Sequence, residues 1–104
     1  MKELTRRYFL LRIVSDTKLT SEQLIELIND SARRNFGELG LSRVNPRIIK
    51  FDMSSSTTVV SCEPRATNEF GAALALITGN AEGPVRILVL RISGTIKGAS
   101  RRRK

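Results

Sequence analysis

The 104-residue chain contains no histidine, no tryptophan and only one cysteine, Cys62. Without imidazoles and with a single thiol, it has no cluster for zinc and no disulfide framework. We expect Cys62 to be a small buried apolar residue. Glycine-rich phosphate loops of the usual spacing and a nucleophile elbow are also missing. We therefore expect no catalytic residue, no metal site and no cofactor held by this chain.

The acidic residues offer no catalytic pair either. Asp16, Asp52 and Glu63 lie beside turns or expected strand ends, with no obvious partner, and are best explained as solvated residues. No apolar run approaches the length of a signal peptide or of a membrane span. We expect an intracellular protein that has no membrane partner.

Acidic side chains are scarce overall. Eighteen Lys and Arg against ten Asp and Glu leave a net charge of +8 and a pI of about 10.8. A small domain with this field attracts polyanions, most often nucleic acid, although solubility alone is the alternative explanation. Five of the positive charges fall within the last eight residues, at Lys97, Arg101, Arg102, Arg103 and Lys104.

Hydrophobic periodicity predicts four strands and two helices. Thr20 and Gln23 form a capping-box pattern, after which apolar residues recur at helical spacing until Gly37 and Gly40 end or interrupt the helix. A second helix is expected over 67–78, with Thr67 or Asn68 as its cap. The strands are expected over 7–15, 47–53, 57–62 and 85–93, with Ser54, Ser55 and Ser56 at a hairpin tip.

The resulting β-α-β-β-α-β order predicts an α+β, ferredoxin-like (RRM-like) two-layer sandwich. Its antiparallel sheet should carry both helices on one face, with the first and last strands adjacent near the centre. Residues 1–98 are expected to form one domain, and residues 99–104 a flexible basic tail.

Two surfaces look too apolar for a monomer. The first and last strands are apolar on both faces, and the second helix has small apolar residues outside its main face. We expect another protein chain to cover them, the alternative being an Ala-rich helix that tolerates exposure. The expected interface residues are Tyr8, Leu10, Phe70, Ala72, Ala75, Leu76, Leu88 and Leu90.

Two well-known users of this topology do not fit. RNA-recognition modules stack bases on aromatic residues of the first and third strands, but the third strand here, TTVVSC, has none. Acylphosphatases need a glycine-rich loop after the first strand, where this chain has Ser15-Asp16-Thr17-Lys18.

Contacts to RNA would therefore be electrostatic, from Lys and Arg to the phosphates of a structured RNA. The expected contacts are Arg12, Arg47, Lys50, Arg91, Lys97, Arg101, Arg102, Arg103 and Lys104. For Arg12 and Arg91, in central strands, a paired structural role is the alternative.

Three segments resemble the small protein subunit of archaeal and eukaryotic ribonuclease P, the component 2 family. They are YFLLRI in the first strand, residues 49–64 leading into AALALITG, and VRILVLRISGTIK, in which residues 89–97 are the most specific part. The resemblance implies a non-catalytic subunit of an endoribonuclease that removes the 5′ leader of precursor tRNA, with chemistry done by Mg²⁺ bound to the RNA subunit.

The resemblance also implies the partners: the ribonuclease P RNA, a TIM-barrel protein subunit (component 3), a second copy of this chain and, indirectly, precursor tRNA. The location would be cytoplasmic in an archaeon and nuclear or nucleolar in a eukaryote. Many family members continue into a longer C-terminal helix, whereas this sequence stops at Arg101, Arg102, Arg103 and Lys104. The rival hypotheses are a protein-binding ferredoxin-like module with no RNA role and an acylphosphatase-like enzyme.

Overall fold

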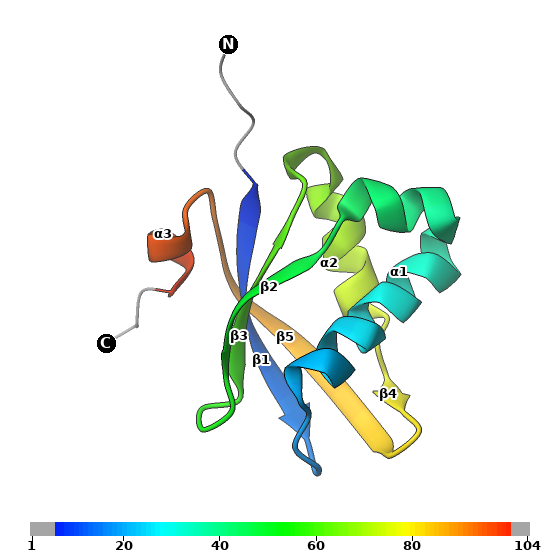
Figure 1. The fold of residues 1–104 in the computed structure, drawn as a ribbon, viewed down its shortest axis with the longest axis vertical. Helices are drawn as coiled ribbons and strands as arrows, with labels where there is room; N and C mark the ends of the chain where they lie inside the picture. Colours follow the sequence, from blue (N-terminus) through cyan, green and yellow to red (C-terminus); the bar gives the residue numbers. More distant parts are fainter. Residues whose placement is uncertain (1–5, 101–104) are drawn as a thin grey trace.

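The computed structural model describes residues 6–100, and its strands form one antiparallel sheet in the order β2-β3-β1-β5-β4 (Figure 1). The elements are β1 (Arg7–Ser15), α1 (Ser21–Val44), β2 (Arg47–Asp52), β3 (Thr57–Cys62), the 3-10 turn η1 (Pro64–Ala66), α2 (Thr67–Ala75), β4 (Gly79–Asn80), β5 (Gly83–Ser93) and α3 (Ile96–Ser100). Helices α1 and α2 lie on one side of the sheet and α3 lies on the other. The ferredoxin-like prediction is confirmed, with β4 and α3 as unpredicted additions.

Helix α1 begins and bends where the sequence indicates. The Thr20 hydroxyl accepts a hydrogen bond from the Gln23 amide at 3.1 Å, and the Gln23 side chain accepts one from the Thr20 amide at 2.9 Å. This reciprocal cap satisfies two amides that have no partner within the helix. Gly37 then interrupts the helix at φ 77°, and Asn45 ends it in the left-handed conformation at φ 47°.

Helix α2 differs from the prediction at both ends, and it stops at Ala75 where the prediction had it continue to residue 78. It is entered through η1, and neither Thr67 nor Asn68 is its cap, because the cap position falls on Ala66. Thr67 instead donates its hydroxyl hydrogen bond back to the Pro64 carbonyl at 2.9 Å. Pro64 fits the first position of a helical turn, where no amide is needed, so the chain starts to turn three residues early.

Strand β5 contains a bulge that the alternation pattern does not reveal. Leu11 pairs with Val89 while Leu10 pairs with Arg91, so Leu90 is the extra residue. Side chains before and after a bulge change faces. Val89 therefore shares the helix side with Leu11, and Ile92 shares it with Phe9, whereas Arg91 points to the α3 side. A similar bulge in β2 occurs at Ile49.

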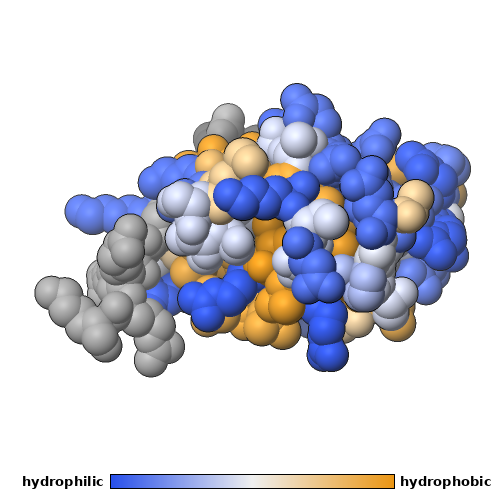
Figure 2. Space-filling view, turned by 90° about the horizontal axis from the view of Figure 1, so that it is seen from below, coloured by the Kyte–Doolittle hydropathy of each residue, from blue (hydrophilic) through white to orange (hydrophobic). Residues whose placement is uncertain are grey.

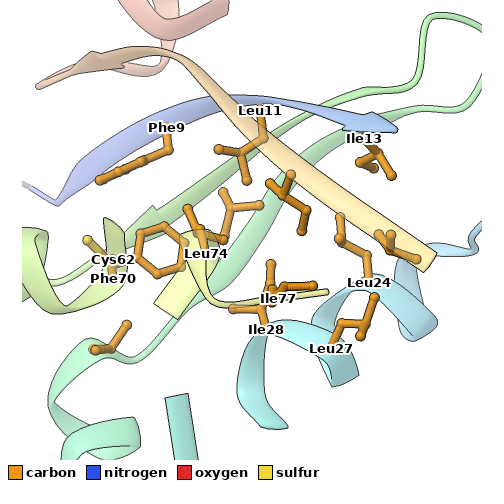
Figure 3. Packing of buried hydrophobic residues seen from close by; sticks show 14 of the residues in the cluster. Phe9, Leu11, Ile13, Leu24, Leu27, Ile28, Cys62, Phe70, Leu74 and Ile77 are labelled. Carbon is orange, nitrogen blue, oxygen red and sulfur yellow. The ribbon is translucent and has the colours of Figure 1, made fainter. Parts of the chain in front are cut away.

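The core lies between the sheet and the two long helices (Figure 3). Phe9 of β1 and Phe70 of α2 meet edge to face, with ring centroids 4.7 Å apart. Such a pair contributes about 0.5–1.5 kcal/mol beyond the apolar area that it buries. The buried Ser31 hydroxyl donates to the Ala73 carbonyl at 2.7 Å and joins α1 to α2.

The C-terminal segment is more ordered than the sequence suggests. Residues 99 and 100, expected to open a flexible tail, belong to α3, and Ala99 is fully buried. The small residues Gly98 and Ala99 allow this close packing against the sheet. The described fold therefore continues to Ser100, and residues 101–104 lie outside the described part of the chain.

Candidate nucleic-acid interface

The sheet face on the α3 side, called here the α3 face, carries its side chains in rows across the strands. Residues that pair across antiparallel strands point to the same face. The rows that follow from the pairing are Arg47, Ser61, Tyr8 and Ser93; Lys50, Val59, Leu10 and Arg91; Asp52, Thr57, Arg12 and Leu88; and Val14 with Arg86. Cations thus occupy both edges and the middle of this face.

Helix α3 covers the first two rows in part. It packs against β1, β3 and β5, and Val59 and Ser61 are buried although α1 and α2 lie on the opposite side. Arg91 Nη1 donates to the Gly98 carbonyl at 3.1 Å and so holds the last turn of α3. The chain itself therefore supplies some of the cover that the apolar alternation led us to expect from a partner.

Positive charges outside this cover face solvent. The side chains of Arg12, Arg47 and Arg86 are exposed and make no hydrogen bond or ion pair with the described residues, 6–100. Lys50 is also exposed, and it lies three strand-to-strand intervals, about 14 Å, from the half-buried Arg91 that holds α3 in the same row. Cations spread over such distances can contact separate phosphates of one nucleic acid.

The acidic residues lie elsewhere, with one exception. Asp52 is the one carboxylate on the five strands, which carry six Lys or Arg residues. It sits at the hairpin tip, where the hydroxyls and amides of Ser54 and Ser55 hold its pKa below the usual value. Four ion pairs within residues 6–100 lie on the helices and chain connections: Arg6–Glu63, Arg33–Glu38, Arg34–Asp30 and Arg43–Glu69. Local pairing thus offsets positive charge on the helix side and leaves the α3 face strongly basic.

The structure brings together most of the predicted phosphate contacts that it describes. Arg12, Arg47, Lys50 and Arg91 share the α3 face, and Lys97 is exposed on α3 itself. Arg101, Arg102, Arg103 and Lys104 lie outside the described residues. Sequence reasoning missed Arg86, although its even spacing from Leu88 places these two side chains on the same face of the last strand.

The predicted protein-interface residues separate into three groups. Tyr8 and Leu10 are half-buried on the α3 face, and Leu88 is exposed there. Ala72, Ala75, Leu76 and Leu90 are exposed at the α2 and β5 edge of the molecule. Phe70 does not fit the prediction, because it is 0% exposed in the core against Phe9 and has no surface for a partner.

Hydrophobic surface reaches the end of the molecule where the β2–β3 hairpin and the β4–β5 connection lie. Figure 2 looks at this end and shows orange surface between long hydrophilic side chains. The exposed large apolar residues include Val14, Leu88, Val89, Leu90 and Ile92 of β1 and β5. Apolar and cationic side chains are therefore interleaved on these two strands.

Cys62 lies at the end of β3 and is fully buried, as predicted. Burial raises the pKa of its thiol to about 11, so the thiol is protonated at neutral pH. Within residues 6–100, no three metal-binding side chains come together as a possible ion site. In the same range, no helix has the length and apolar character needed to span a membrane.

The fold and the strand charges define the class of protein, a small ferredoxin-like domain with one basic sheet face. The family model described as Rpp14/Pop5 matches residues 7–103. The chain therefore belongs to the Rpp14/Pop5 family of ribonuclease P protein subunits.

Individual relatives agree with this assignment. Ribonuclease P protein component 2 of Pyrococcus abyssi is 34% identical over 91 residues, covering 88% of this chain and 77% of that protein. The ribonuclease P/MRP protein subunit POP5 of Schizosaccharomyces pombe is 35% identical over 89 residues, covering 84% of this chain and 64% of that protein. A chain in the cryo-EM structure of yeast ribonuclease MRP matches with a TM-score of 0.72 and 13% identity, over 91% of this chain and 78% of that one, and confirms the fold.

Proposed function

We propose that this subunit binds the ribonuclease P RNA through the basic α3 face and supports that RNA in removing the 5′ leader of precursor tRNA. The observation that carries the proposal is the charge separation: the strands place five cations and one carboxylate on the α3 face, and the ion pairs Arg6–Glu63, Arg33–Glu38, Arg34–Asp30 and Arg43–Glu69 lie on the helices and chain connections. Screening of phosphate repulsion by such a face favours a compact RNA. In this proposal the chain is not catalytic, and Mg²⁺ bound by the RNA does the chemistry.

The face suits phosphates of a structured RNA better than unstacked bases. Base stacking requires exposed aromatic rings, and the residues of β3 on this face are Thr57, Val59 and Ser61. Tyr8, the one aromatic on the face, is half-buried. Readout would then depend on RNA shape and charge, which is consistent with the chain acting inside a larger ribonucleoprotein.

The further parts of the proposal concern partners and location. A TIM-barrel protein subunit would bind the exposed apolar residues of α2, self-association would occur within the complex, and precursor tRNA would be met indirectly. The location would be the cytoplasm of an archaeon, or the nucleus and nucleolus of a eukaryote.

The test compares two arginine variants that differ in position. Affinity for the ribonuclease P RNA should be measured across a salt series for wild type, for Arg12→Ala combined with Arg86→Ala, and for Arg65→Ala. Each lost phosphate contact should reduce the slope of log affinity against log salt by roughly 0.7–0.9. Arg65 is an exposed cation in η1, outside the α3 face, and is the control.

The expected result is a smaller slope for the double variant and an unchanged slope for Arg65→Ala. Equal slopes for all three proteins would contradict the proposal that the α3 face binds RNA. In a reconstituted reaction with the RNA and the TIM-barrel subunit, the double variant should also need more Mg²⁺ for cleavage of precursor tRNA.

A further inference from the structure

Strand β5 forms an open edge of the sheet over most of its length. Its first residues pair with β4, through Gly79–Pro84 and Asn80–Gly83, and the Val85 amide donates to the Thr78 carbonyl at 3.0 Å. From Arg86 onward, β5 pairs with β1 on one side and with no described strand on the other. Most of this eleven-residue strand thus has main-chain groups on its outer side that face no described neighbouring strand.

The direction of these groups follows from the Val85 hydrogen bond. Backbone amides and carbonyls on a strand point to alternate sides, so those of Ile87 and Val89 point the same way as those of Val85. The pairing with β1 stays regular from Val85 to Val89, before the bulge at Leu90. Ile87 and Val89 therefore present amides and carbonyls at the open edge.

Side chains along this edge are apolar and exposed. The exposed fractions are 42% for Leu88, 42% for Val89, 36% for Leu90 and 49% for Ile92. Exposed strand edges in soluble proteins are usually protected by charges, by proline or by covering elements, since an open edge is a template for another strand. The bulge and Arg86 give only partial protection here.

Charge distinguishes the possible occupants. A partner strand beside β5 would place alternate side chains next to Val89 and Ile92 on the helix side, where apolar residues fit. On the other side it would meet Arg86, where a carboxylate fits. A second copy paired antiparallel about the middle of this segment would bring Arg86 of one copy close to Arg91 of the other, and like charges placed opposite each other are destabilising.

We propose that the open edge of β5, residues 86–92, takes up an extended segment of a different protein whose residues alternate between apolar and acidic. The added strand binds through the main-chain groups of Ile87 and Val89. Its apolar side chains cover Val89 and Ile92 beside α2, and its carboxylates approach Arg86. This surface shares Arg86 with the proposed RNA face, whereas the main-chain groups of Ile87 and Val89 belong to the open edge alone.

The test uses the full chain and a capped nine-residue peptide of alternating valine and glutamate. In NMR titrations, the peptide should shift the amide signals of Ile87 and Val89 and slow their hydrogen exchange. The same peptide with N-methylated alternate amides cannot form the strand ladder and should bind at least about tenfold more weakly. A peptide with lysine in place of glutamate is the charge control.

Two substitutions in the protein separate the main-chain and charge contributions. Val89→Pro removes the outward amide, whereas Val89→Ala keeps it, so only the proline variant should lose binding by about tenfold or more. Arg86→Glu should weaken binding of the glutamate peptide and strengthen binding of the lysine peptide. Unshifted amides at 87 and 89, or equal binding by the proline and alanine variants, would overturn the proposal.

Two further measurements test whether a second copy occupies the edge and whether RNA binding is separate from it. A dimer of the chain that Val89→Pro dissociates would show that a second copy occupies the edge, which also contradicts the proposal. The salt slope of RNA binding should be unchanged in Val89→Pro, so a failure of the strand proposal is distinguishable from a failure of RNA binding.

Discussion

The guanidinium of Arg6 and the carboxylate of Glu63 join the start of β1 to the chain just after β3, with Nη1 and Oε2 2.9 Å apart. Arg6 also donates from Nε to the Ser61 hydroxyl at 2.8 Å and from Nη2 to the carbonyls of Asn45 and Ser61. One side chain thus connects β1, β3 and the end of α1.

This relationship predicts an asymmetric response to substitution. Arg6→Ala should lower the free energy of unfolding by about 1–3 kcal/mol, because part-buried carbonyls lose their donor. Glu63→Gln should cost less than about 1 kcal/mol, since the carboxylate is 42% exposed and solvent screens the pair. Urea unfolding of both variants measures the difference, and equal losses would show that the ion pair, not the carbonyl contacts, dominates.

Substitutions on the buried and exposed faces of α2 should differ strongly in their effect on stability. Phe70→Ala should lower the free energy of unfolding by about 3–5 kcal/mol, because it empties core space beside Phe9. Ala72→Glu should leave stability within about 0.5 kcal/mol of wild type, since Ala72 is exposed. We expect Ala72→Glu to fold and to weaken binding of the proposed TIM-barrel subunit. Calorimetric unfolding checks the first part, and unchanged binding would make this side of α2 ordinary surface.

Gly98 holds α3 against the sheet because no side chain fits there. A Cβ at this position would come within 2.3 Å of the Ser93 hydroxyl and 2.9 Å of the Thr95 hydroxyl, both of which cap the turn before α3. Gly98→Ala should cost about 1–2 kcal/mol and speed hydrogen exchange at the Ala99 amide. Gly71→Ala is the control, because open space surrounds Gly71 in α2 and the change should stabilise by up to about 1 kcal/mol.

The buried thiol makes stability depend on alkaline pH. The pKa of Cys62 is raised from 9.0 to about 11 in the folded protein, chiefly by burial. The unfolded thiol therefore loses its proton first, so the contribution is complete below pH 9 and is lost as pH rises from 9 to about 11. Urea unfolding at pH 7 to 10 should show a steeper decline for wild type than for Cys62→Ala. Parallel curves would mean that the thiol is not the cause.

The isolated chain should cleave no RNA. Nothing in residues 6–100 forms a metal-binding cluster, and the one thiol is buried and protonated. Repurified protein free of RNA should leave precursor tRNA intact in Mg²⁺, as followed by gel electrophoresis. Cleavage that survives repurification and is lost in a point variant would contradict a non-catalytic role.

Local signals predicted most of the fold. The Thr20–Gln23 cap, Gly37 and the strands over Arg7–Ser15 and Thr57–Cys62 were located correctly because capping, glycine conformation and strand composition act over a few residues. The bulge at Leu90 was not predictable, because it depends on how β5 pairs with a strand far away in sequence. Because of this bulge, simple alternation along the last strand does not give the face of Ile92, which pairs with Phe9.

The candidate site was only partly predictable for the same reason. That Arg12, Lys50 and Arg91 share a face depends on the register of four strands, which composition does not contain. Phe70 was misassigned because a nine-residue helix with apolar residues all round does not show which side meets the sheet. The order of residues 99–100 depends on a tertiary contact of Ala99.

The break in α1 at Gly37 limits how far the longest helix extends in one direction. A straight helix over the 24 residues would be about 36 Å long and would carry its last residues past the sheet. The corner instead returns Val44 to the core and brings the Asn45 carbonyl to Arg6. The φ of 77° favours glycine although the space around it is open. The backbone torsion at position 37 therefore determines whether the segments of α1 before and after it can both pack against the same core.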